Sequence, residues 1–137
     1  MIRILLVDDD DLSRGAIHKM LERAGYSVES THDGDEVIRM YGQEAADLVI
    51  TDLIMPDKDG LEIIQELRRI NPKVRILAIS GGGRVDANEY LAVARKFGAV
   101  EVLSKPFTKE DLRRAVETAL GSGGSSPGSA GTDPDGS

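Results

Sequence analysis

Short apolar runs alternate with stretches of helical periodicity five times along residues 1–120, and this alternation limits the possible folds more than any other feature. The run 2–7 is nearly apolar throughout, as in a strand that is buried on both faces. Similar runs lie at 26–31, 47–51, 74–79 and 100–103, and each is followed by apolar residues that recur every three or four positions. Strands that alternate with helices form a parallel sheet covered on both faces, and right-handed crossovers make that sheet doubly wound. We therefore predict an α/β fold with a five-stranded parallel sheet and five helices.

The apolar residues of the helical segments predict which helix faces cover the sheet. In the first helix the predicted buried face consists of residues spaced mostly four apart: Leu12, Ala16, Met20, Leu21 and Ala24. Leu61, Ile64, Leu67 and Ile70 mark the third helix, which is expected to stop before Asn71 and Pro72. The second strand, 26–31, is more polar than the others, which predicts an edge position in the sheet.

The composition changes abruptly at the end of the fifth predicted helix. Residues 121–137 contain six Gly, five Ser and two Pro and no large apolar side chain, so we predict a flexible tail or linker there and one folded domain over 1–120. No apolar run approaches the ~18 residues of a membrane span. The chain has no cysteine, which excludes disulfides and thiolate chemistry and gives secretion no support. We expect a cytoplasmic protein.

The charge of the chain argues against nucleic acid as a partner. The formal net charge is −7 and the sequence has no Trp. Binding to phosphates requires clustered Lys and Arg, and binding to single strands usually adds aromatic stacking. We expect this chain alone to bind neither nucleic acid nor a membrane.

Polar side chains follow four of the predicted strands at the point where each strand ends. Asp8 and Asp9 follow the first strand, Asp52 the third, Ser80 the fourth and Lys105 the fifth. Ligands of open α/β sheets bind beyond the carboxyl ends of the strands, so we expect these side chains to lie together. Asp10 and Asp11 are expected instead to cap the first helix and to interact favourably with its dipole.

Three clustered carboxylates require a cation. Two carboxylates about 4 Å apart repel by roughly 4 kcal/mol at an effective dielectric constant near 20. A small hard ion such as Mg²⁺ prefers oxygen ligands and commonly completes its coordination with phosphate oxygens. Asp52 facing a metal-bound phosphoryl group is a candidate nucleophile that would form an aspartyl phosphate, with Lys105 and Ser80 contacting the phosphoryl oxygens.

Four segments in register resemble the receiver domain of two-component response regulators. They are residues 5–10 (LLVDDD), 52–60 (DLIMPDKDG), 79–81 (ISG) and 105–107 (KPF), and the resemblance extends over residues 1 to about 120. It implies a flavodoxin-like sheet of order 2-1-3-4-5 and a signalling switch rather than an enzyme that turns over a separate substrate. It also implies that Asp52 accepts a phosphoryl group from a phosphohistidine of a sensor histidine kinase or phosphotransfer protein.

The resemblance also implies roles for individual residues. Asp9, Asp52 and the backbone carbonyl of Ile54 would bind Mg²⁺ directly, and Asp8 would act mainly through water. Ser80 would be the switch hydroxyl, Lys105 the phosphate-binding cation, and the Lys105–Pro106 peptide bond would be cis. The loop residues Asp57, Asp59 and Gly60 are expected to shape the site, with Asp59 as a helix cap. Downstream proteins are expected to dock on the face formed by residues 84–120.

Two features depart from the pattern of this family. Val102 occupies the position where the family commonly has an aromatic switch residue, so switching by rotation of that ring is not available. Gly81, Gly82 and Gly83 form a bare loop after Ser80, and we expect this loop to rearrange through its backbone.

Other functions remain open from the sequence. A Mg²⁺-dependent hydrolase with Asp52 as nucleophile usually needs a second acid two positions later, where this chain has Ile54. The same residue offers no side chain to orient an attacking water, so we expect slow self-dephosphorylation. A flavin-binding module lacks support because acids, rather than a hydroxyl-rich phosphate loop, follow the first strand. The chain is either a stand-alone switch or the receiver portion of a longer regulator.

Overall fold

Five parallel strands and five helices alternate along the chain in the structure, a computed structural model that describes residues 1–55, 59–81 and 87–121. The strands are β1 (Arg3–Val7), β2 (Ser27–Thr31), β3 (Leu48–Asp52), β4 (Ile76–Ser80) and β5 (Glu101–Ser104). The helices are α1 (Asp11–Arg23), α2 (Gly34–Gln43), α3 (Gly60–Ile70), α4 (Ala87–Phe97) and α5 (Lys109–Gly121). The strand order is β2-β1-β3-β4-β5, so the predicted doubly wound sheet is confirmed, and its strands lie within one or two residues of the predicted runs.

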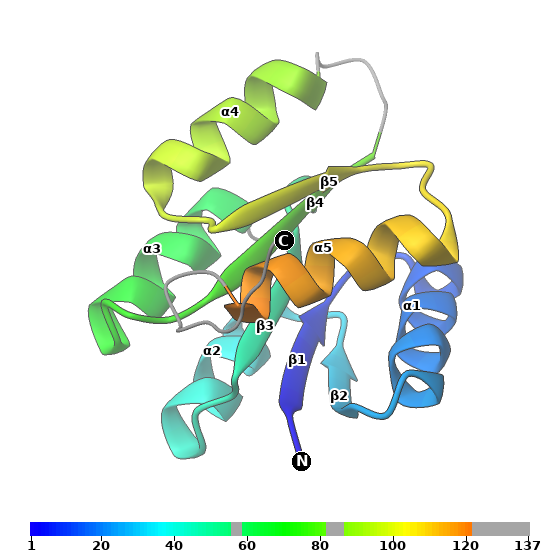
Figure 1. The fold of residues 1–137 in the computed structure, drawn as a ribbon. Coiled ribbons are helices and arrows are strands. Elements are labelled where there is room, and N and C mark those ends of the chain that lie inside the picture. The colour runs from blue at the N-terminus through cyan, green and yellow to red at the C-terminus, as the bar shows by residue number, and fades with distance from the viewer. Residues whose placement is uncertain (56–58, 82–86, 122–137) are drawn as a thin grey trace.

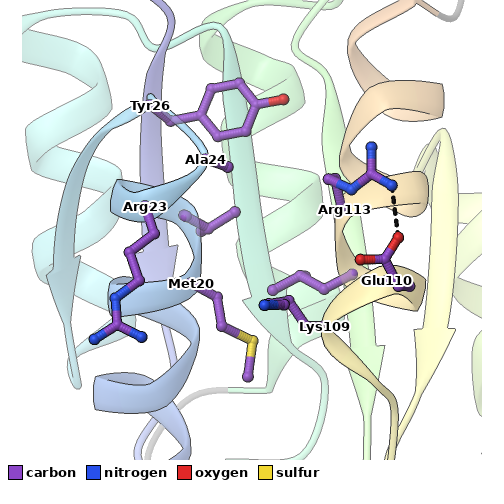
Figure 2. A pocket seen from close by; sticks show the side chains of 9 residues that line it. Met20, Arg23, Ala24, Tyr26, Lys109, Glu110 and Arg113 are labelled. Atoms are coloured by element: carbon purple, nitrogen blue, oxygen red, sulfur yellow. Dashed lines mark hydrogen bonds and ion pairs between the residues drawn. The ribbon is translucent and has the colours of Figure 1, made fainter.

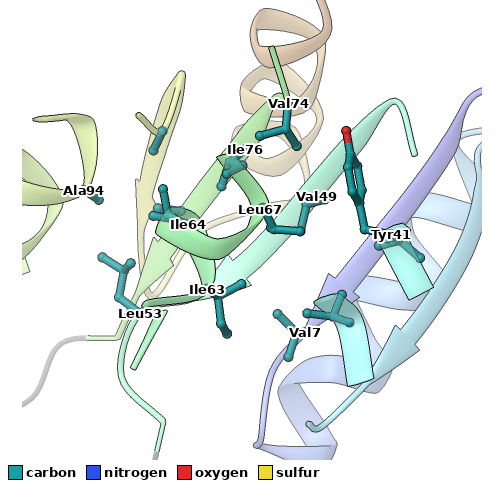
Figure 3. Packing of buried hydrophobic residues seen from close by; sticks show 14 residues of the cluster. Val7, Tyr41, Val49, Leu53, Ile63, Ile64, Leu67, Val74, Ile76 and Ala94 are labelled. Carbon is teal, nitrogen blue, oxygen red and sulfur yellow. The ribbon is translucent and has the colours of Figure 1, made fainter. Parts of the chain in front are cut away.

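The sheet separates two hydrophobic clusters, because successive side chains of each strand point to opposite faces. Leu5 and Val7 of β1 pack with α2, α3 and α4, whereas Ile4 and Leu6 pack with α1 and α5. Figure 3 shows the first cluster, in which Ile63, Ile64 and Leu67 of α3 lie against the central strands. Because β1, β3 and β4 are covered on both faces, their sequences are apolar almost throughout.

Aspartates begin three of the helices. Asp10, Asp33 and Asp59 are the N-caps of α1, α2 and α3, and each accepts hydrogen bonds from backbone N–H groups of the first turn. These are donors that the helix itself leaves without partners. The expected caps Asp10 and Asp59 are thus confirmed, and both caps join the sheet edge to a helix that begins there.

The predicted buried face of α1 is only partly confirmed, because Leu21 is buried and Met20 packs against the same cluster, but the other members are exposed. Leu12 is 86% exposed, and Ala16 and Ala24 are also exposed, whereas Ile17 and Leu21 are 2% exposed and form the contact with the sheet. The helix is therefore rotated from the predicted orientation. Two apolar stripes run along it, and periodicity alone does not say which one meets the core.

The predicted third helix is confirmed as α3, which ends at Ile70. Of the residues that marked it, Ile64 and Leu67 are fully buried, Leu61 is partly buried and Ile70 is 48% exposed. Ile63 is buried as well.

The carboxyl ends of the strands form one edge of the sheet. Val7 pairs with Thr31 and Thr51, Asp52 with Ile79, and Ser80 with Ser104, so the residues that follow β1, β3, β4 and β5 meet there. Among the described residues, no helix combines the length and the apolar character that crossing a membrane requires.

Replacing Ile17 by Ala should lower the free energy of unfolding by about 2–4 kcal/mol, because it leaves a cavity under α1. Replacing Leu12 by Ala should change it by no more than about 0.5 kcal/mol, because that side chain is exposed. Urea unfolding followed by circular dichroism measures both values. Equal losses in the two variants would contradict the observed orientation of α1.

Candidate functional site

Three carboxylates converge at the carboxyl edge of the sheet. Asp8 and Asp9 follow β1, Asp52 ends β3, and carboxylate oxygens of all three lie within 4.8 Å of one another. Asp8 is 2% exposed and Asp52 is 7% exposed, whereas Asp9 is exposed. Two of the acids are therefore largely removed from solvent, and the third faces it.

Lys105 lies against the two buried acids. Its Nζ is 3.2 Å from Asp8 Oδ2 and 3.4 Å from Asp52 Oδ2. Partial burial disfavours the charged ammonium, but Asp52 and Asp8 outweigh this effect and raise the pKa of Lys105 above its usual value. The ammonium is thus held in its charged form between the carboxylates.

The pKa of Asp52 is raised to about 6. Burial is the main cause, Lys105 opposes it, and the neighbouring Asp8 adds to it. The backbone N–H of Ile54 donates to Asp52 Oδ1 at 3.2 Å and favours the ionised form, but it does not reverse the shift. Ionised Asp52 is therefore held at a cost in free energy that an additional positive charge would reduce.

The donor set fits a hard divalent cation. Three ionised carboxylates and one ammonium leave the site with a net negative charge. All the available ligand atoms are oxygens, which suit Mg²⁺ or Ca²⁺ better than softer metals. Asp8, Asp9 and Asp52 are the residues able to hold such an ion, and the Ile54 backbone lies beside the Asp52 carboxylate.

Ser80 has a buried hydroxyl at the end of β4. Its Oγ has no hydrogen-bond partner among the residues that the structure describes, and the residue is fully buried. A buried hydroxyl without a partner costs about 1–3 kcal/mol, which favours a further acceptor arriving at this edge. The backbone N–H of Lys105 donates to the Ser80 carbonyl at 2.8 Å, so the two residues are directly connected. The Lys105–Pro106 peptide bond is cis.

Arg14 supports the acidic loop and was missed by the sequence reasoning. Its guanidinium donates to the Asp8 carbonyl oxygen at 2.7 Å and to Asp11 Oδ1 at 2.6 Å. The available signal was its position in the first turn of α1, three residues after the last of four consecutive acids. Asp11 thus contributes to the loop through Arg14.

Gly60 is the point of closest approach between α3 and the site. A Cβ atom at this position would lie 2.6 Å from the Cα of Leu53 and would also overlap the backbone carbonyl oxygen of Asp52. Its N–H donates to the Leu53 carbonyl at 3.0 Å, which ties the start of α3 to the end of β3. Asp57 lies outside the described residues, as do Gly82 and Gly83, so the expectations for them stay predictions.

Val102 is half-buried on β5, opposite Ala78 of β4, and packs against the cluster beneath α2, α3 and α4. Nearby, Arg95 of α4 and Glu101 form an ion pair of 2.8 Å.

Residues 84–86 of the predicted docking face lie outside the described part of the chain. The rest of that face is formed by α4, β5 and α5, with Val93 37% exposed.

Replacing Gly60 by Ala should lower the free energy of unfolding by about 1–3 kcal/mol, because the new methyl group meets backbone atoms that cannot move aside cheaply. The matched control is Gly42→Ala, at an exposed position in α2 with no atom within 4 Å, which should gain up to about 1 kcal/mol. Thermal or urea unfolding measures both. A Gly60→Ala protein as stable as the control would contradict the close approach.

Replacing Asp52 by Asn should raise the free energy of unfolding at pH 8 in EDTA by about 1–3 kcal/mol. The pKa of Asp52 is raised on folding, so its ionisation removes stability as the pH rises from about 4 to about 6 and the loss is complete above that window. Unfolding curves at pH 4 and pH 8 measure the difference, which should be small at pH 4.

At pH 8, Mg²⁺ should then reduce the difference in the free energy of unfolding between Asp52→Asn and the wild type. The reason is that a ligand that binds only the folded protein stabilises it. The control Asp33→Asn keeps an equally good helix cap and should match the wild type at both pH values. A less stable Asp52→Asn protein at pH 8 would contradict the assigned electrostatics.

Known proteins resemble this chain in sequence. The response regulator receiver domain family matches residues 4–117. The response regulator receiver protein CpdR of Brucella abortus is 36% identical over 120 residues, covering 88% of this chain and 98% of that protein. The DNA-binding transcriptional regulator NtrC of Azospirillum brasilense is 35% identical, covering 87% of this chain but 24% of its own length. The chain thus spans nearly all of one relative and about a quarter of another.

Solved structures resemble this chain in fold as well. A response regulator receiver domain protein from Clostridium thermocellum has a TM-score of 0.80 and 31% identity, covering 88% of this chain and 94% of that one. A response regulator from Burkholderia pseudomallei, with a phosphorylated aspartic acid, a calcium ion and citrate, has a TM-score of 0.75 and 29% identity, covering 88% of this chain and 69% of that one. The chain belongs to the response regulator receiver domain family of two-component signalling.

Proposed function

We propose that the chain is a phosphorylation-activated switch whose phosphoacceptor is Asp52. The observation that carries the proposal is the arrangement of Asp52 between two further acids and the Lys105 ammonium at the carboxyl edge of the sheet. Membership of the receiver family and the phosphorylated aspartic acid of the Burkholderia pseudomallei relative support it.

In the proposed reaction an Asp52 carboxylate oxygen attacks the phosphorus of a phosphohistidine. A P–O bond forms, the P–N bond of the donor breaks, and the electron pair of that bond returns to the donor imidazole. Lys105 would shift from its ion pairs towards a phosphoryl oxygen, and the Ser80 hydroxyl would donate to another. The buried hydroxyl without a partner and the charged ammonium at the same edge of the sheet support these two roles.

Asp8, Asp9, Asp52 and the Ile54 carbonyl would hold a Mg²⁺ ion at this site. When bound, the ion supplies charge neutralisation for the phosphoryl oxygens during transfer. Asp8 is the most deeply buried of the three acids and already contacts Lys105. This position suits its expected contact with Mg²⁺ through a water molecule.

The same residues suit a switch better than a hydrolase. Ile54 is 44% exposed beside Asp52 and carries no group able to deliver a proton or to orient water. A covalent aspartyl phosphate at this site would therefore be lost slowly, which favours a signalling role over turnover of a separate substrate.

We also propose the partners of this chain and the limits of its receiver domain. The phosphodonor would be a sensor histidine kinase or a phosphotransfer protein, and a downstream protein would dock on the face of residues 84–120. Residues 1–120 would form the receiver domain, and 121–137 would be a tail or a linker. A cytoplasmic location is part of the same proposal.

Intact-mass analysis after incubation with acetyl phosphate and Mg²⁺ tests the phosphoacceptor. The wild type should gain one phosphate that hydroxylamine removes, Asp52→Asn should gain none, and omission of Mg²⁺ should suppress the gain. After removal of the donor, the phosphate should persist well beyond seconds.

Asp33→Asn is the matched control, because it makes the same chemical change at an exposed helix cap. It should be phosphorylated like the wild type. Phosphate gained by Asp52→Asn would refute the assignment, and continuous release of phosphate from many esters would favour the hydrolase.

A further inference from the structure

The guanidinium of Arg14 reaches back from the first turn of α1 to the acidic loop. The Arg14 side chain is 20% exposed, and its Nη1 donates to the Asp8 carbonyl oxygen at 2.7 Å. Its Nη2 forms an ion pair with Asp11 Oδ1 at 2.6 Å. An arginine that holds a backbone carbonyl and a carboxylate at once is fixed in one orientation, because its donors form a rigid planar fork.

The contact with the Asp8 backbone distinguishes Arg14 from an ordinary surface ion pair. Figure 2 shows such a pair in α5, where Glu110 and Arg113 have the same i, i+3 spacing and the same separation of 2.6 Å. Both of those side chains are more than half exposed. Within residues 1–55, 59–81 and 87–121, Arg113 donates to carboxylates and to no backbone carbonyl. The ion pair alone therefore does not explain why Arg14 is largely buried.

The carbonyl that Arg14 holds belongs to the peptide group that precedes Asp9. The peptide group that follows Asp9 is held as well, because the N–H of Asp10 donates to Asp8 Oδ1 at 3.0 Å. Among the described residues, no hydrogen bond or ion pair holds the exposed Asp9 carboxylate itself. The position of this carboxylate therefore depends on the two flanking peptide groups, one of which Arg14 fixes.

Asp8 is anchored on its other sides by groups from the sheet. Its N–H donates to the Thr31 carbonyl at 3.2 Å, and its Oδ2 lies 3.2 Å from Lys105 Nζ. Arg14 adds the contact from α1, so the loop is held from a helix as well as from the strand ends. Ligands that are in place before an ion arrives bind it more tightly, because less ordering accompanies binding.

The positive charge of Arg14 by itself opposes a cation nearby. Asp11 offsets this charge from a side chain that is 85% exposed, so the guanidinium holds the loop with less repulsion of an ion. Removing Arg14 therefore has two opposite effects on cation binding. Loss of the fixed backbone weakens it, whereas loss of a positive charge strengthens it, and the sign of the measured change shows which effect is larger.

We propose that Arg14 is a positioning residue for the candidate Mg²⁺ site and that Asp11 keeps its charge from opposing the ion. Arg14 acts through the Asp8 carbonyl on the backbone that carries Asp9, one of the carboxylates able to hold the ion. This inference rests on the proposed function, because it concerns the same site.

Calorimetric titration of the metal-free protein with MgCl₂ tests the role of Arg14. Arg14→Met keeps much of the apolar stem, removes the donors and should weaken Mg²⁺ binding about tenfold, which is typical for loss of a residue that orients a ligand. The loss should persist in about 0.5 M NaCl, because its cause is geometric rather than electrostatic. In ¹⁵N spectra of the metal-free protein, the amide signals of Asp9 and Asp10 should shift or broaden.

Asp11→Asn tests the charge balance. It leaves the Arg14 charge without its partner and should weaken Mg²⁺ binding about twofold at low salt, and added NaCl should abolish this difference. The matched controls are Arg113→Met and Glu110→Gln, which break an ion pair of the same spacing in α5 and should bind Mg²⁺ like the wild type.

Tighter or unchanged Mg²⁺ binding by Arg14→Met would overturn the positioning role, as would an equal loss in Arg113→Met. Urea unfolding in EDTA shows whether each variant is folded under the conditions of the titration. If Arg14→Met does not fold, Asp11→Asn decides, and unchanged affinity at low salt then overturns the inference. A wild type that binds no Mg²⁺ would instead refute the proposed function, so the two failures are distinguishable.

Discussion

The buried charges of Asp8, Asp52 and Lys105 are the constraint on which the organisation of this molecule depends. Two carboxylates removed from water repel each other, and a single ammonium compensates them only in part. The fold must therefore hold all three groups rigidly, and it does so by placing each at the end of a different strand. The remaining negative charge favours the binding of a further cation at this site.

The surroundings of these charges are built to keep them in place. Hydrogen-bonded caps at Asp10 and Asp59 begin α1 and α3 close to the site, Gly60 allows α3 to approach the Asp52 backbone, and Arg14 fixes the acidic loop through the Asp8 carbonyl. Each contact joins a helix start to a strand end. The starts of α1 and α3 are therefore tied directly to the strand ends that carry the carboxylates.

The two faces of the sheet differ in how they use their helices. On one face, α3 buries Ile63, Ile64 and Leu67. On the other face, α1 buries Ile17 and Leu21 and leaves Leu12 exposed.

The sequence by itself determined the order of strands and helices, the caps at Asp10 and Asp59, and the set of residues that meet at the carboxyl edge. These follow from local periodicity and from the rule that parallel strands end together. Only the tertiary structure decided which stripe of α1 meets the core, that Gly60 touches the Asp52 backbone, and that Lys105 lies between Asp8 and Asp52. Rotation of a helix and distances between strand ends depend on packing between segments far apart in the chain, which local patterns do not contain.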